Sequence, residues 1–136
     1  MKMKYVIVLN KDIENWIALN TTAHMCAKLG SVVGEELSGE EPVDKSGIKH
    51  SGIPKFANAV LVARDSNKIR SIIDKAKNFD LVVIDYPKEG LDTYTDEEFC
   101  EAVSNKKNEE IEFIGCCIFG KTEIVNKVTG DLKLWK

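Results

Sequence analysis

The chain has 136 residues, of which 43% are hydrophobic and 30% are charged, and its net charge is −3 at pH 7. These values are typical of a globular protein in water and favour one domain, residues 1–136, whose core needs no disulfide or metal. The acidic balance provides no overall basic field, so a nucleic-acid partner is not expected. No apolar run approaches the ~18 residues of a membrane span, and Met1–Leu9 lacks the features of a signal peptide, so we expect a cytoplasmic protein without a membrane partner.

A strand followed by a helix is predicted at the start of the chain. Tyr5–Leu9 is a continuous apolar run, and residues 10–12 connect it to a helix-like segment from about residue 13. At about 100° per residue, one arc of roughly 100°, the width of a core-facing stripe, collects four apolar side chains and two polar ones. Its members are Ile13, Trp16, Ile17, Asn20, His24 and Ala27. Because an unpaired buried polar group costs ~1 to 3 kcal/mol, we expect His24 to face inward beside Asn20, near the carboxyl end of the first strand.

Strands and helices alternate in the rest of the chain. The expected elements are a long connection at 34–54, strands at 59–63, 81–84 and 111–119, a helix capped by Ser66, a turn-rich segment at 86–90, a short helix with a capping box at 95–98, and a helix at 122–128. Continuous Val, Ile and Leu strands separated by helices indicate a sheet that is covered on both faces. The predicted fold is therefore a single-domain α/β protein, a three-layer α/β/α sandwich with a four-stranded mixed or mostly parallel sheet.

Residues Gly115–Thr122 match the phosphate-loop pattern G-x-x-x-x-G-K-[ST]. A phosphate loop must curl its backbone N–H groups around an anion, whereas the apolar run Cys116–Phe119 favours an extended strand. We therefore predict a strand that runs into a turn, and not a nucleotide site. The start of the helix near Thr122 is the remaining candidate for contact with an anionic group.

Metal and cofactor sites are not predicted. The chain has only two histidines, and its cysteines show no C-x-x-C spacing, so reduced thiols used as small apolar residues are expected. The cysteines are Cys26, Cys100, Cys116 and Cys117.

The beginning of the chain resembles type II peptidyl-tRNA hydrolases. In that family a strand ending in a basic residue and Asp leads into a helix with an A-A-Q-x-x-H-A pattern, and here Lys4–Asp12 precedes the N-T-T-A-H sequence of residues 20–24. On this register His24 matches the family histidine and Thr21 takes the position of the glutamine. Residues 81–85 resemble the strand that ends in the family's Asp, here Asp85. The resemblance implies a peptidyl-tRNA hydrolase II-like fold.

A closer resemblance, over nearly the whole chain, is to a bacterial domain-of-unknown-function family, the one numbered two thousand. Its members similarly join an N-T-T-A-H helix to a long loop, a P-x-x-x-A-x strand segment and an ending like residues 130–135. The chain also departs from the hydrolases, because two of their lysine positions fall on Asn15 and Ile17, and residues 85–90 replace their D-A-G-x-T-Q signature. RNA affinity depends on such cations, so authentic peptidyl-tRNA hydrolysis is not expected.

Two functions remain open from the sequence. The favoured one is a noncatalytic binding or interaction protein that holds a small ligand or a second copy of itself as a homodimer. The alternative is a hydrolase in which His24 acts as base or acid with Asp12 or Asp85, since ligands favour the carboxyl ends of parallel strands. The ligand-binding candidates are Asn10, Lys11, Asn20 and Thr21.

Overall fold

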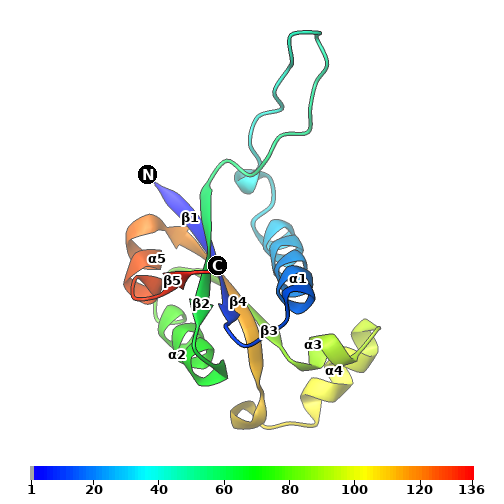
Figure 1. The fold of residues 1–136 in the computed structure, drawn as a ribbon, viewed down its shortest axis with the longest axis vertical. Coiled ribbons are helices and arrows are strands. Elements are labelled where there is room, and N and C mark those ends of the chain that lie inside the picture. Colours follow the sequence, from blue (N-terminus) through cyan, green and yellow to red (C-terminus); the bar gives the residue numbers. More distant parts are fainter. Residues whose placement is uncertain (1) are drawn as a thin grey trace.

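The computed structural model describes residues 2–136 and contains one five-stranded mixed sheet in the order β3-β4-β1-β2-β5 (Figure 1). The strands are β1 (Met3–Asn10), β2 (Ala57–Ala63), β3 (Val82–Pro87), β4 (Phe113–Lys121) and β5 (Lys133–Leu134). The α-helices are α1 (Asn15–Val33), α2 (Ser66–Ala76), α3 (Glu89–Asp92), α4 (Asp96–Ser104) and α5 (Thr122–Thr129), with 3₁₀ helices η1 (Gly34–Leu37) and η2 (Asn108–Glu110). The α/β class is therefore confirmed.

The sheet differs from the prediction in its number of strands. Strand β1 is parallel to β2, and β4 runs antiparallel to both β1 and β3, so β1, β2 and β3 share one direction. The expected four strands become five because Lys133 and Leu134, near the end of the chain, pair with Val62 and Leu61 of β2. A two-residue strand has no detectable period in the sequence, so only its pairing with β2 reveals it.

Helices cover both faces of the sheet, as expected. Helix α1 lies on one side together with α3 and α4, and α2 and α5 lie on the other (Figure 1). Because side chains alternate along a strand, β1 contributes to two cores. Val6 and Val8 pack with residues of α2 and α5, whereas Tyr5, Ile7 and Leu9 pack with residues of α1.

Helix α1 faces the sheet with a different side from the one predicted. Its buried residues are Ala18, Thr21, Met25 and Leu29. Asn20 and His24 are exposed, so the prediction that both lie on the core-facing side is wrong. The physical reason is that α1 carries apolar residues on two sides, and periodicity alone does not decide which side the sheet covers.

The ends of the other helices follow local capping chemistry. Ser66 is the predicted cap of α2, but the observed cap is Asp65. Its side chain accepts a hydrogen bond from the backbone N–H of Lys68 at 2.8 Å. The Ser66 hydroxyl instead accepts from the backbone N–H of Phe113 at 2.8 Å. Thr95 caps α4 as predicted by accepting from the N–H of Glu98 at 3.1 Å.

The phosphate-loop match lies in a strand, as predicted. Gly115–Lys121 belongs to β4, and residues 113–120 are buried. The expected turn is absent from this segment, because α5 begins directly at Thr122. The backbone N–H of Thr122 donates to the carbonyl of Lys2 at 3.1 Å, so the chain itself occupies that donor.

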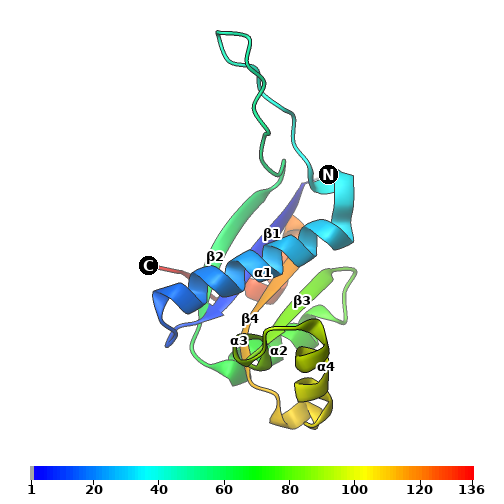
Figure 2. The same ribbon diagram turned by 90° about the vertical axis from the view of Figure 1, so that its right-hand side faces the viewer.

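Residues 38–56, here called the arm, project from the body of the protein (Figures 1 and 2). The arm folds back on itself, with the N–H of Gly39 donating to the carbonyl of Ile53 at 3.0 Å and the His50 ring 2.8 Å from a carboxylate oxygen of Asp44. Together with η1 it confirms the predicted long connection.

Candidate functional site

A groove with a volume of about 500 Å³ follows the open edge of the sheet at β3. Strand β3 is an edge strand, with β4 as its single neighbour in the sheet. The groove is lined by His24, Met25 and Lys28 of α1, by Val83–Tyr86 of β3, and by Asp96 and Phe99 of α4. A second pocket of about 260 Å³ shares His24, Tyr86, Asp96 and Phe99 with it. Helices far apart in the sequence thus form one continuous concave surface with the edge strand.

The ring of His24 lies beside the ring of Tyr86 in both cavities. Their centroids are 5.5 Å apart and the planes are tilted by 39°. Tyr86 is only 8% exposed, and burial raises the pKa of its phenol. A Cβ added to Gly90 would approach the Tyr86 ring to 2.7 Å, so the small residue at 90 allows this packing. The Tyr86 hydroxyl is buried and has no hydrogen-bond partner among the described residues.

An ion pair between a buried carboxylate and an exposed lysine anchors the α3–α4 side of the groove. Glu89 is 6% exposed, and its Oε2 lies 2.5 Å from Nζ of Lys106, just after α4. Burial opposes ionisation of Glu89, but the hydrogen bond from Lys106 and the nearby positive charges outweigh it, so the pKa of Glu89 is lowered. The hydroxyl of Thr93 donates to the carbonyl of Glu89 at 2.9 Å. These contacts hold the segment that carries Phe99 close to β3.

Three predicted site residues form the turn between β1 and α1. Asn10 Oδ1 accepts from the backbone N–H of Asp12 at 3.0 Å, and the N–H of Lys11 donates to the carbonyl of Ala63 at 2.9 Å. None of the three lines the groove. Helix α1 rises about 13 Å between Asn15 and His24, which separates the turn from the histidine. The observed roles of Asn10, Lys11 and Asp12 are therefore contacts within the turn.

Asp85 borders the groove, but its position in β3 directs its side chain away from His24. Ile84 and Tyr86 belong to the core on the α1 side, and Val83 packs in the core on the α2 side. Since side chains alternate along a strand, Asp85 shares the side of Val83. The predicted acid–base pair requires a hydrogen bond between His24 and a carboxylate. No such hydrogen bond is present in the described part of the chain.

The remaining predicted residues lie outside the groove lining. Asn20 is exposed on α1, and Thr21 is fully buried. Sequence reasoning missed Tyr86, Asp96 and Phe99, which the tertiary structure gathers around His24. The available signal was the turn-rich segment that follows the third strand, together with the capped helix after it.

Comparison with known proteins identifies the family. The family model described as "Protein of unknown function (DUF2000)" matches residues 3–136. The chain belongs to the DUF2000 family. Among solved structures, a protein of unknown function from Agrobacterium tumefaciens is similar to the DUF2000 chain, with a TM-score of 0.87 and 23% identity over 100% of this chain and 99% of that chain. This identity supports a shared fold only. No curated protein matches.

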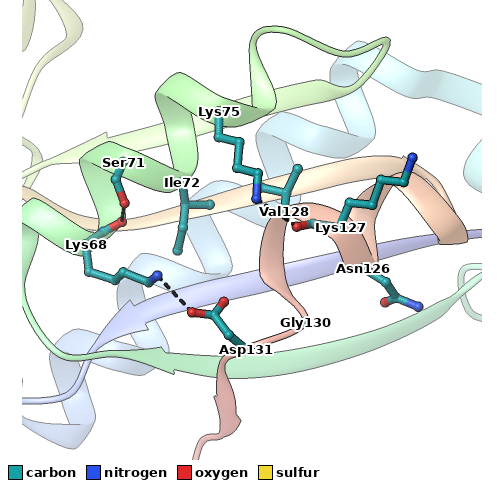
Figure 3. A pocket seen from close by; sticks show the side chains of 9 residues that line it. All are labelled: Lys68, Ser71, Ile72, Lys75, Asn126, Lys127, Val128, Gly130 and Asp131. Carbon is teal, nitrogen blue, oxygen red and sulfur yellow. Dashed lines mark hydrogen bonds and ion pairs between the residues drawn. The ribbon is translucent and has the colours of Figure 1, made fainter.

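A separate cleft of this DUF2000 protein lies between α2 and α5, on the other face of the sheet, and has a volume of about 310 Å³ (Figure 3). Two lysines there are already engaged by the chain. Nζ of Lys68 lies 2.9 Å from Asp131 Oδ2, and Nζ of Lys75 donates to the carbonyl of Lys127 at 3.0 Å. The side chain of Lys127 extends away from both (Figure 3). The contacts in this cleft join α2 to the end of the chain.

No cysteine of the DUF2000 protein lines the groove, and three of the four thiols are also unreactive. Burial raises the pKa of Cys26 and Cys116, and it raises the pKa of Cys117 to about 12. These three groups are therefore protonated at neutral pH, and the thiolate is the reactive form. Within residues 2–136, no three His, Cys, Asp or Glu side chains gather as metal ligands, and no helix is long and apolar enough to cross a membrane.

Proposed function

We propose that this DUF2000 protein is a noncatalytic binding protein that holds a small ligand in the groove between α1, β3 and α4. The observation that carries the proposal is the groove itself, whose volume of about 500 Å³ falls in the range of small-molecule sites. Such sites combine aromatic and apolar walls with a few polar groups that orient the ligand. Tyr86, Phe99 and Met25 provide the apolar part here.

The charges around the groove define the ligand class. Lys28 lies on the α1 side, and Asp96 lies on the α4 side. A ligand that satisfies both sides has a flat apolar group between a negative and a positive substituent. The flat group would pack between Phe99 and the His24–Tyr86 pair, because aromatic faces gain about 0.5–1.5 kcal/mol from offset or edge contacts.

Binding is favoured over catalysis because the groove lacks a matched acid–base pair. A catalytic histidine is usually oriented by a third group that accepts its other ring proton. His24 has no such carboxylate among the described residues, and Asp85 belongs to the opposite side of the sheet. The second candidate function, a hydrolase acting through His24 and the strand-end Asp85, is favoured by one observation, the presence of both residues at one groove.

We also propose that the fold is related to that of type II peptidyl-tRNA hydrolases. The support is the opening segment, where a strand leads through Lys11 and Asp12 into the helix that carries Thr21 and His24. The proposal extends to fold only, since the family's two lysine positions are Asn15 and Ile17 here.

A thermal-shift screen against metabolites, nucleotides and RNA fragments tests the binding proposal. A ligand present at 100 times its dissociation constant stabilises the folded state by about 2.7 kcal/mol. We expect a hit whose effect is lost in Phe99→Ala and retained in Ser71→Ala, a control in the α2–α5 cleft. Ligands that raise the Tm of Phe99→Ala as much as that of the wild-type protein would contradict the groove assignment. If the protein instead hydrolyses one of these ligands, and His24→Ala and Asp85→Asn abolish that hydrolysis, the hydrolase function would replace the binding function.

A further inference from the structure

The solvent side of α1 is unusually apolar. Figure 2 shows α1 lying across the sheet with none of the other described elements over its outer side. That side carries a row of residues that we call the outer face of α1, consisting of Trp16, Leu19, Ala23, Ala27 and Gly30. At about 100° per residue they fall within an arc of roughly 80°. Trp16 is 58% exposed and Leu19 is 73% exposed.

The outer face contains no charged residue, although 30% of the chain is charged. Lys28 is the single Lys, Arg, Asp or Glu of α1, and it lies outside the row. The indole N–H of Trp16 already donates to the carboxylate of Glu14 at 3.2 Å, so the rest of the ring is free for apolar contact. A helix that is apolar on both sides normally has a neighbour on both sides.

Residue size changes along the outer face. Its large side chains, Trp16 and Leu19, lie in the first half of α1, and its small residues, Ala23, Ala27 and Gly30, lie in the second half. Gly30 costs helix stability, by about 1 kcal/mol relative to Ala. Packing within the chain does not require this glycine, because a Cβ added there would meet no atom within 4 Å.

A pocket of about 370 Å³ opens at the small end of the outer face, at the base of the arm. Its lining includes Gly30, Gly34, Leu37, Ile53 and Pro54. Trp16 and Gly30 are 14 residues apart, so the two ends of the face are separated by about 21 Å. Glu35, Ser38 and Ser51 complete the pocket, so its walls are both apolar and polar. The same helix therefore presents a protruding aromatic ring at one end and a mixed pocket, with Leu37, Ile53 and Pro54 as its apolar part, at the other.

We infer that the outer face of α1 pairs with the outer face of a second copy of this chain, antiparallel and two-fold, so that Trp16 of each copy fills the other's pocket at the arm base. A two-fold interface requires a patch that is complementary to itself. An axis at Ala23 satisfies this requirement, because it sets Trp16 opposite Gly30 and Leu19 opposite Ala27. This assembly is separate from ligand binding in the β3 groove.

The size of the contact sets the expected affinity. Four helical turns from each copy and two buried indole rings make a total interface of roughly 1,000 Å², near the lower limit for specific association. Interfaces of this size are typical of weak, reversible association, so we expect a dissociation constant in the micromolar range or weaker. Trp16 is its anchor, since aromatic residues buried in a pocket of the partner supply most of the energy of such interfaces.

Sedimentation velocity of the full chain, over roughly 1 µM to 1 mM, measures the association. We expect Trp16→Ala and Gly30→Leu each to weaken the dimer by at least about tenfold. Gly30→Leu should leave the monomer folded, since its Cβ enters open space and leucine favours helix. Leu134→Ala on β5 is the control, because Leu134 is also 58% exposed. A monomer at every concentration, or a dimer that neither substitution weakens, would overturn the inference.

Cross-linking tests the position of the axis. In a Cys100→Ser background, which removes an exposed thiol, Ala23→Cys should form a disulfide-linked dimer under mild oxidation because Ala23 faces itself across the axis. Ser71→Cys on α2 should not cross-link. Failure of Ala23→Cys to cross-link while the dimer persists would show that another surface carries the association.

Discussion

Replacing Thr21 by valine should make this protein more stable. Thr21 lies on the buried side of α1 with no exposed surface, and its Oγ1 has no hydrogen-bond partner among the described residues. A buried hydroxyl without a partner costs about 1–3 kcal/mol. Valine has nearly the same shape and the same branching at Cβ, so Thr21→Val removes that cost without opening a cavity.

The expected gain is about 1–2 kcal/mol in the free energy of unfolding, which corresponds to roughly 3 to 6 °C in Tm for a protein of this size. Thr129→Val is the matched control. Thr129 is also buried in a helix, at 2% exposure, but its hydroxyl donates to the carbonyl of Val125 at 2.9 Å. Removing that hydrogen bond should lower stability by about 1 kcal/mol. Urea denaturation and thermal melting of both variants provide the comparison.

The refuting result is a loss of stability in Thr21→Val similar to that in Thr129→Val. It would mean that the Thr21 hydroxyl has a partner in solution, such as an ordered water. Because Thr21 is buried and lines neither cavity beside His24, we also expect Thr21→Val to leave ligand binding in the groove unchanged.

Three further substitutions or assays test other parts of the structure. Lys106→Ala should lower Tm at pH 7, and the difference from wild type should shrink toward pH 3. The reason is that the pKa of Glu89 is lowered in the folded state. Ionised Glu89 therefore stabilises the fold above the ordinary carboxyl pKa of about 4.3, and this stabilisation is lost as the pH falls through the folded-state pKa. Thermal melts across this pH range, with Lys107→Ala as the control, measure it. Gly115→Ala should destabilise the fold by about 1–3 kcal/mol in urea denaturation, because the new Cβ would lie 2.7 Å from the carbonyl oxygen of Val8. The wild-type protein should cleave peptidyl-tRNA no faster than the His24→Ala variant does. Cleavage that depends on His24 would contradict the binding proposal.

The elements of this fold were largely predictable because their signals are local. The apolar runs of β1, β2 and β3 and the cap at Thr95 depend on neighbours within a few residues. The same local reasoning identified the segment Cys116–Phe119 as strand despite the phosphate-loop pattern. The candidate site was predictable only in part. His24 does border a groove, but its surroundings of Tyr86, Asp96 and Phe99 depend on where α4 packs.

The sequence alone determined the α/β class, the positions of the main strands and helices, and the exposed long connection between α1 and β2. The tertiary structure decided which side of α1 the sheet covers, which placed Asn20 and His24 outside the core and left Trp16 in solvent. It also decided that β4 lies between β1 and β3, leaving β3 as the open edge beside the groove. The physical reason is that hydrophobic periodicity shows that a surface must be buried, whereas the partner that buries it is chosen by long-range packing.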